Sequence, residues 1–279
     1  MKNWIIGAIL VLAVVAAYYF FNVYQPAEPE VITSAPVAVV EPVIEPAEPV
    51  ETDSATALDT DFLPAPEAET EEVPLPMLTE SDPVVLESLD GLVGESAVQQ
   101  YVVGDNVISR VVATIDMLGS RQVPGVVQAV SGPESSFEVI VNDNPGTIIT
   151  NEEGDPIPQF ILDPANYARY TPYVELLEAA DTADLIANYR SMYPLFQEAY
   201  RQMGYADAEF DNRLVEIIDD LLATPEITGP LNLVKPEAFF LFTDPDLESR
   251  SAGQKILLRM GNENAARVKA KLKEIKAGL

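Results

Sequence analysis

The chain has 279 residues, and its 45 acidic side chains against 16 Lys and Arg give it a net charge of −29. Such a surface repels phosphate groups, so we expect no nucleic acid partner and no anionic lipid bound through a general basic surface. The sequence contains no Cys and no His. This excludes disulfides, thiol nucleophiles, Cys/His zinc sites and a Ser-His-Asp triad, and we assign no metal ligand and no cofactor.

Residues 1–24 predict a short cytoplasmic start followed by a membrane anchor. Residues 4–21 are uncharged and mostly apolar, which is long enough for a transmembrane helix. Lys2 precedes this span and the next basic residue is Arg110. The positive-inside rule then predicts a single-pass protein of the inner (cytoplasmic) membrane, with its N-terminus in the cytoplasm and its folded domain in the periplasm. The alternatives are a cleaved signal peptide and a buried core helix.

Residues 25–76 differ sharply in composition, because Pro and Glu dominate and Lys and Arg are absent. Proline interrupts helices and sheets, and like charges repel one another along the chain. Such a segment cannot bury enough apolar surface to fold. We interpret it as a disordered, acidic, proline-rich linker.

Residues 77–279 predict one folded domain that is mainly α with a minor antiparallel β-sheet (α+β). Helix starts are indicated by pairs of a capping residue and a proline, since proline fits the first helical position. These pairs are Asp82-Pro83, Asp163-Pro164, Thr171-Pro172 and Asp244-Pro245.

Apolar periodicity predicts helices over about 105–118, 182–203 and 210–223. Pro194 lies inside the second of these, so we expect a kink or break just before it. Asp211 is interpreted as the N-cap of the third helix.

Short strands are expected between these helices. Residues 137–141 are rich in β-branched side chains and end at a dense turn signal, and 147–150 and 159–161 follow as further short strands. Residues 231–234 predict another strand. Four apolar residues at 239–242 are buried as a strand or a helix, and the pattern leaves both open.

The C-terminal part predicts two helices, one from about 246 to 260 and one from the break at Gly261-Asn262 to the end. They hold half of the basic side chains. We expect this basic pair to dock its apolar faces on the acidic remainder of the domain, with the lysines at the rim.

The candidate binding site is a group of aromatic, basic and amide side chains in the central helices. Tyr and Arg combine large contact area with directed polar atoms, and arginine can hold a carboxylate. The alternative is an internal network, in which the arginines pair with the chain's own acids and the tyrosine hydroxyls are bonded at the edge of the core. The group consists of Asn166, Tyr167, Arg169, Tyr170, Arg190, Tyr193 and Gln197.

Three other sequence patterns give only weak indications of function. Paired carboxylates are expected by chance in so acidic a chain, although a glycosidase also needs such a pair. The acidic run beginning at Asp207 lacks the Gly and Glu of a calcium loop, with Asn212 and Ile218 in their places. Ser251 and Lys255 are one residue too far apart for a Ser-x-x-Lys hydrolase. We assign no catalytic residue.

Several motifs together resemble a bacterial family known as domain of unknown function 3014. They are Arg110–Asp116, Asp163–Tyr170, Tyr193–Tyr200, Leu222–Pro225 and Ser251–Gly261. The resemblance covers about 75–279 and implies an anchored envelope protein with a proline-rich tether. It implies no activity, ligand or catalytic residue. Met117 departs from the family pattern, which has Asn there.

From these features we expect a non-enzymatic, membrane-anchored envelope protein that presents a periplasmic binding or scaffold domain. Its partner is expected to be an envelope protein or a cell-wall component. The alternative is a carboxylate-dependent hydrolase acting on envelope glycans. A cleft with two facing acids favours the hydrolase, whereas a groove lined by Tyr and Arg favours the binding domain.

Overall fold

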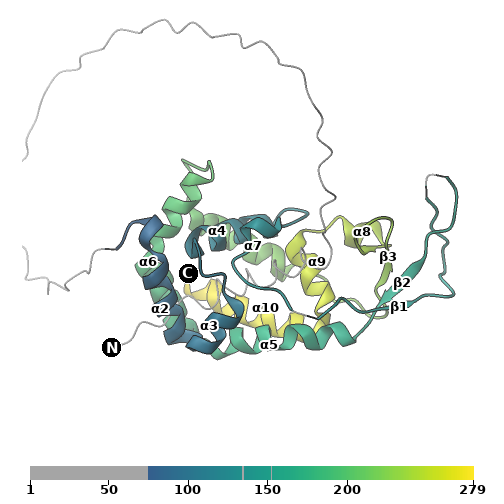
Figure 1. Cartoon of the computed structure of the whole chain (residues 1–279), viewed down its shortest axis with the longest axis horizontal. Coiled ribbons are helices and arrows are strands. Elements are labelled where there is room, and N and C mark those ends of the chain that lie inside the picture. Colours follow the sequence, from purple (N-terminus) through teal and green to yellow (C-terminus); the bar gives the residue numbers. More distant parts are fainter. Residues whose placement is uncertain (1–74, 134, 152) are drawn as a thin grey trace, which may run out of the picture. The chain divides into compact units, whose positions relative to one another are not determined.

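The computed structural model describes residues 75–133, 135–151 and 153–279 (Figure 1). The anchor expected at 4–21 and nearly all of the linker expected at 25–76 lie outside these residues. Within them, no helix combines the length and apolar character needed to cross a membrane.

The described part of the chain is mainly helical with one small sheet, as the sequence predicts. The α-helices are α2 (Asp82–Val93), α3 (Glu95–Tyr101), α4 (Val107–Leu118), α5 (Ala165–Ala179), α6 (Thr182–Gln202), α7 (Phe210–Leu222), α8 (Pro245–Glu248), α9 (Ala252–Arg259) and α10 (Gly261–Gly278). Two 3₁₀ turns lie at Leu78–Glu80 and Gly125–Val127.

The sheet is antiparallel throughout, with the strand order β1-β2-β3-β4. Its strands are β1 (Val139–Val141), β2 (Gln159–Leu162), β3 (Asn232–Val234) and β4 (Leu241–Phe242). Leu162, Leu233 and Phe242 form a small apolar cluster with Leu247 of α8 and Leu258 of α9, which attaches the sheet to the helices. β1, β2 and the segment between them extend away from the helices (Figure 1).

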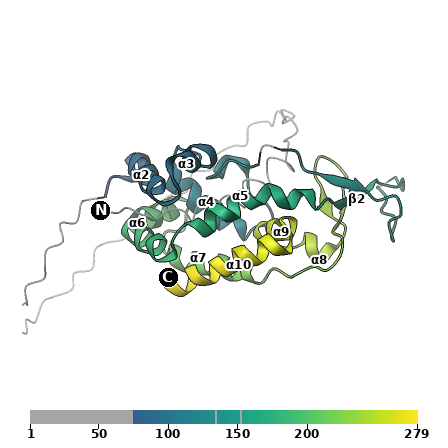
Figure 2. The ribbon, with the colours of Figure 1, turned by 90° about the horizontal axis from the view of Figure 1, so that it is seen from below.

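The main core lies among the helices, and α10 is near its centre. Val268, Leu272 and Ile275 recur at helical spacing along α10 and are buried. The helix packs against α5, α6, α7 and α9, and Figure 2 shows it beside α5. The last helix in chain order therefore fills the space between several earlier ones.

Two helix boundaries predicted at prolines are absent, namely a start at Pro172 and a break before Pro194. Thr171-Pro172 does not begin a helix, because α5 has already started beside Asp163-Pro164 and continues through Pro172. A proline inside a helix removes only one backbone hydrogen bond when its neighbours hold the segment. For the same reason α6 is not interrupted at Pro194.

Two predicted helix caps also have other roles. Asp211 lies in the first turn of α7, and its carboxylate accepts a hydrogen bond from the Tyr189 hydroxyl. Asp82 is the first residue of α2, and its carboxylate instead accepts from the backbone N–H groups of Asn106 and Val107 at the start of α4. Asp244 and Ser251 do cap α8 and α9 with their side chains.

The strand predictions hold in part. Residues 147–150 form no strand beyond an isolated bridge between Thr150 and Pro156. Of the apolar run 239–242, Leu241 and Phe242 form β4, so the strand interpretation is correct for these two residues. Phe242 is buried, but the other three residues are only half-buried, so the predicted burial of the whole run is wrong. The helix predicted over 246–260 is divided, because α8 ends at Glu248 and Ser251 caps the start of a separate helix, α9.

The basic C-terminal segment docks on the rest of the domain, but not all of its charges lie at the rim. Lys276 pairs with Asp219 and Arg267 with Glu178 at partly exposed positions. Lys255, Arg259 and Lys271 are buried instead. Lys255 pairs with Glu248 at 2.7 Å. The ammonium of Lys271 and the guanidinium of Arg259 each donate to a backbone carbonyl, so burial leaves them hydrogen-bonded.

Candidate functional site

Asn166 joins the start of α5 to the residue before β1. Its amide nitrogen donates to the carbonyl oxygens of Glu138 at 2.6 Å and Asp163 at 2.8 Å. Its amide oxygen accepts from the Glu138 backbone N–H at 3.0 Å and from the Arg169 guanidinium at 2.9 Å. The side chain is fully buried. It therefore acts as a structural joint between helix and sheet.

Arg169 lies one turn further along α5 and reaches the loop before β1. Its Nε donates to the Ser135 hydroxyl at 2.9 Å, and its Nη2 donates to the Ser135 carbonyl oxygen. Partial burial lowers the pKa of the guanidinium from its ordinary value. Arginine nevertheless keeps its proton in proteins, so a fixed positive charge lies at this position.

The two neighbouring tyrosines of α5 belong to the interior. The ring of Tyr167 lies against Gly261, where a Cβ atom would approach it to 2.8 Å. The carbonyl oxygen of Tyr167 also accepts from the Asn264 side chain at 2.8 Å. Tyr170 is buried, and burial raises the pKa of its hydroxyl.

The remaining three predicted site residues lie on α6 and face other parts of the domain. Arg190 donates to the carbonyl oxygens of Gly278 and Leu279, both at 2.8 Å. Arg169 on α5 bonds instead to Ser135 and Asn166, so the two arginines contact different segments. The hydrogen bonds above connect both arginines to other parts of the domain, and none of these bonds goes to an Asp or Glu side chain.

Tyr193 and Gln197 help to fix the start of α7. The Tyr193 hydroxyl lies 2.8 Å from the Glu209 carboxylate and 3.0 Å from the Gln197 amide oxygen. Gln197 accepts from the Phe210 backbone N–H and donates to the Ala208 carbonyl oxygen, both at 2.8 Å. Burial, followed by the bond to Glu209, raises the pKa of Tyr193 to about 12. The predicted group is thus divided between α5 and α6.

A hollow of about 420 Å³ lies beside Arg169. One wall is a single face of α5, and the other is formed by the end of α3 and the loop that precedes β1. We call it the Arg169 hollow. It is lined by Gln100 and Tyr101 on α3, by Ser131, Gly132, Pro133 and Ser135 in the loop, and by Ala168, Arg169, Pro172 and Tyr173 on α5.

Two tyrosines form the aromatic part of this lining. The rings of Tyr101 and Tyr173 pack at 4.9 Å between centroids with a 58° tilt. The Tyr173 hydroxyl donates to the Ser131 carbonyl oxygen at 3.2 Å, and the Ser131 backbone N–H donates to the Tyr101 carbonyl oxygen at 2.8 Å. These bonds hold the loop against α3 and α5, so the hollow is preformed.

Of the predicted site residues, only Arg169 lines this hollow. Tyr173 had a signal in the sequence, because it lies four residues after Arg169 on the same helical face. Tyr101 and the serines had none, since only the fold brings α3 and the loop beside α5.

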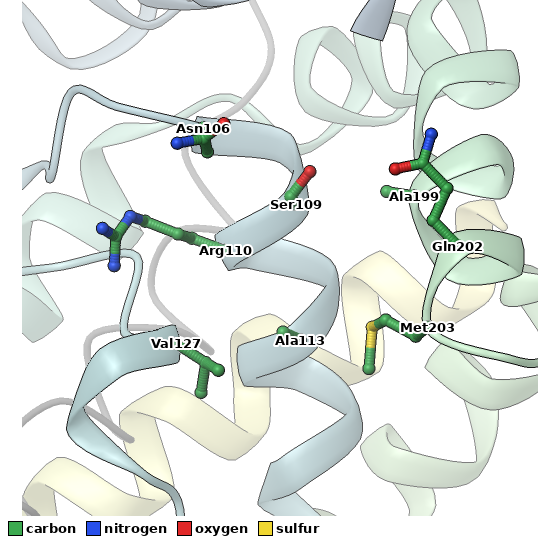
Figure 3. Close-up of a pocket in the computed structure, with 8 residues that line it drawn as sticks. All are labelled: Asn106, Ser109, Arg110, Ala113, Val127, Ala199, Gln202 and Met203. Atoms are coloured by element: carbon green, nitrogen blue, oxygen red, sulfur yellow. The ribbon is translucent and has the colours of Figure 1, made fainter. Parts of the chain in front are cut away.

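A second hollow, of about 350 Å³, lies between α4 and the end of α6. Figure 3 shows Arg110 extending from α4 away from Gln202 and Met203. The Arg110 guanidinium pairs with Asp105 at 2.8 Å and donates to the Gln128 carbonyl oxygen at 3.3 Å. Arg110 therefore fixes the neighbouring loops, and the remaining lining is largely small or apolar.

A third hollow, of about 320 Å³, lies next to the sheet and has Asp244 as the acid in its lining. None of the three hollows combines two carboxylates among its described lining residues. The described residues also contain no group of three Asp or Glu side chains arranged to hold a metal ion.

Two acids, Asp116 on α4 and Asp220 on α7, form contacts between helices. Asp116 is buried and pairs with Arg213 at 2.7 Å, and the Tyr205 hydroxyl reaches it at 3.2 Å. Asp220 accepts from Gln254 and from the Ser251 hydroxyl. Each acid therefore joins two helices that are distant in the sequence, α4 to α7 and α7 to α9.

The fold and the Arg169 hollow define a mainly helical α+β domain with a preformed polar and aromatic surface site. The chain belongs to the family described as protein of unknown function (DUF3014), which it matches over residues 107–276. The matched range begins with α4, so Gln100 and Tyr101 precede it. No curated protein and no solved structure matches the chain.

Proposed function

We propose that the chain is a non-enzymatic envelope protein, anchored in the inner membrane by residues 4–21, that presents residues 77–279 in the periplasm as a binding or scaffold domain. The observation that supports this is the Arg169 hollow, in which an arginine and a tyrosine pair line one preformed surface. The length and apolar character of 4–21 and the acidic, proline-rich sequence of 25–76 support the anchored arrangement.

The chemistry of the hollow suits a ligand that carries a carboxylate beside a flat apolar surface. A guanidinium binds a carboxylate through directed, charge-assisted hydrogen bonds. Tyrosine rings contribute contact area at a low cost in side-chain entropy. The backbone and hydroxyl groups of the 131–135 loop add hydrogen-bonding atoms nearby. A peptide-bearing cell-wall component or a segment of an envelope protein has this chemistry.

The alternative, a carboxylate-dependent hydrolase, has no comparable support. Such an enzyme needs two carboxylates across a cleft, about 5–10 Å apart. The three hollows described above do not present such a pair among their described residues.

Site-specific photo-crosslinking in intact cells tests the binding proposal. A crosslinking amino acid is placed at Gln100, which is exposed and lines the hollow, and the adducts are identified by mass spectrometry. We expect one dominant partner that carries carboxylates. The control position is Lys273, which is exposed on α10, and it should not yield the same adduct.

Two variants show whether the hollow itself binds. Arg169→Gln removes the charge, and Ala168→Trp fills the hollow from an exposed position without altering the bonds of Arg169. Both should abolish the Gln100 adduct, and Ala168→Trp should leave the melting temperature nearly unchanged. An adduct that survives both variants contradicts the proposal.

The proposed membrane topology is tested separately with single introduced cysteines. This is possible because the native sequence contains none. Single Ser→Cys variants at Ser54, after the apolar span, and at Ser135 provide one thiol each. A membrane-impermeant maleimide should label both in intact cells, and the chain should stay with the membranes. A soluble chain that lacks its first residues would instead indicate a cleaved signal peptide.

A further inference from the structure

β1 is an edge strand whose outer side is available for pairing. It contacts only β2 in the sheet order. Ile140 pairs with Ile161, the Asn142 backbone N–H donates to Gln159, and the Glu138 carbonyl accepts from Asp163. In an antiparallel ladder alternate residues face the partner strand, so the backbone groups of Val139 and Val141 point to the opposite side.

The side chains around this edge are apolar and exposed. Ile140 and Val141 are 47% and 60% exposed, and Ile148 in the following segment is 67% exposed. Natural edge strands are normally protected by lysine, proline or a bulge, and β1 contains neither lysine nor proline. Figures 1 and 2 show this part of the chain extending beyond the helices.

Acidic side chains flank the edge, and Arg169, which bonds to Ser135 and Asn166, lies on the Glu138 side of it. Residues 122–168 contain no Lys or Arg. Glu138 and Asp143 flank β1 and are exposed, as are Glu153 and Asp155 in the segment that joins β1 to β2. A strand that adds here therefore meets an acidic border on both sides of an apolar centre.

We propose that β1 is a docking edge for an extended segment of a partner protein in which apolar residues alternate with Lys or Arg. Backbone hydrogen bonds to Val139 and Val141 would hold this segment as a further antiparallel or parallel strand. The basic side chains would pair with Glu138 and Asp143 across the new strand boundary. This surface is separate from the Arg169 hollow and takes a partner of different chemistry.

The same charges argue against a second copy of this chain as the occupant. Two-fold pairing of β1 with itself, centred on Ile140, would place Glu138 of one copy opposite Asn142 of the other, with Asp143 one residue further along. Each copy also carries a net charge of −29, so the acids that flank the edge in the two copies repel one another. Self-pairing is therefore the weaker arrangement, and the experiment distinguishes it.

The test uses the full-length chain in neutral detergent and a fluorescent peptide of alternating Lys and Val. We expect the peptide to bind, as measured by anisotropy, and to perturb the backbone NMR signals of 139–141. The matched peptide of alternating Glu and Val should not bind. A third peptide is N-methylated on alternate residues and cannot form the edge hydrogen bonds. Its dissociation constant should be at least about tenfold higher than that of the unmodified Lys peptide.

Two variants test the edge from the protein side. Val141→Pro removes an N–H that faces outward and leaves the bonds to β2 in place, so it should abolish binding with little change in melting temperature. Glu138→Gln with Asp143→Asn keeps the backbone intact and should weaken the Lys peptide selectively.

Three results would overturn the proposal. The first is equal binding of the Lys and the N-methylated peptides, which indicates charge attraction alone. The second is binding that Val141→Pro does not alter. The third is a concentration-dependent dimer that Val141→Pro abolishes, which assigns the edge to a second copy.

Discussion

Gly261 begins α10 with a φ of +80°, and the ring of Tyr167 lies directly against it. We predict that Gly261→Ala lowers the free energy of unfolding by about 2–4 kcal/mol, because the new methyl group combines backbone strain with a clash at 2.8 Å. Gly204→Ala is the matched control, since its φ is +106° and no atom lies within 4 Å of a Cβ there.

The control should lose only the strain contribution, about 1–2 kcal/mol. Urea denaturation of both variants measures the difference. Equal losses would show that the Tyr167 contact adjusts without cost.

At the level of single residues, the sequence indicated which side chains are polar and aromatic, but not what they contact. From the sequence, we place Asn166 and Gln197 in the candidate binding site because they are polar residues among aromatic ones. Each is buried and bonded to a backbone segment that only the fold brings near, at Glu138 and at Ala208. Helical spacing predicts which residues share a face, whereas it does not predict what lies opposite that face.

Asp82 connects two elements, because its carboxylate on α2 accepts both backbone N–H groups at the start of α4, each at 2.8 Å. We predict that Asp82→Ala lowers the free energy of unfolding by about 1–2 kcal/mol, as for the loss of a helix cap. Asp82→Asn should cost less, since it keeps one acceptor oxygen.

Glu87→Ala is the control, because Glu87 is exposed on the same helix. Thermal denaturation measures all three. A loss for Glu87→Ala as large as that for Asp82→Ala would contradict a specific capping role.

At the level of elements, the strongly periodic helices were predictable and the short ones were not. The ranges predicted for α4, α6 and α7 differ from the structure by at most a few residues. The division between α8 and α9 was missed, because it depends on Asp220 and Gln254 binding Ser251.

The candidate site was predicted as one group because α5 and α6 adjoin in sequence. Arg169 in fact reaches the loop before β1, and Tyr193 reaches the start of α7.

The whole molecule carries an uneven charge distribution. Several of its 16 basic side chains are used internally, including the buried Lys255, Arg259 and Lys271. The acids that remain on the surface therefore repel one another. We predict that the melting temperature rises as sodium chloride is increased, because salt screens this repulsion more than it weakens exposed ion pairs.

A gain of about 1 kcal/mol would correspond to roughly 2–4 °C in a domain of this size. Tetramethylammonium chloride at equal ionic strength should give the same rise, since screening depends on ionic strength alone. Calorimetry provides the measurement, and a melting temperature that falls with either salt would contradict it.

The central position of α10 also affects the order in which the chain can fold. Tyr167 meets Asn264 and Ala180 meets Lys271 across about a third of the sequence. Contacts between such distant segments form slowly, because a long loop must close before they stabilise anything. During synthesis, α2 to α7 emerge before the helix that fills their common core. Their apolar faces remain open until α10 leaves the ribosome, and in that interval they are exposed to other chains.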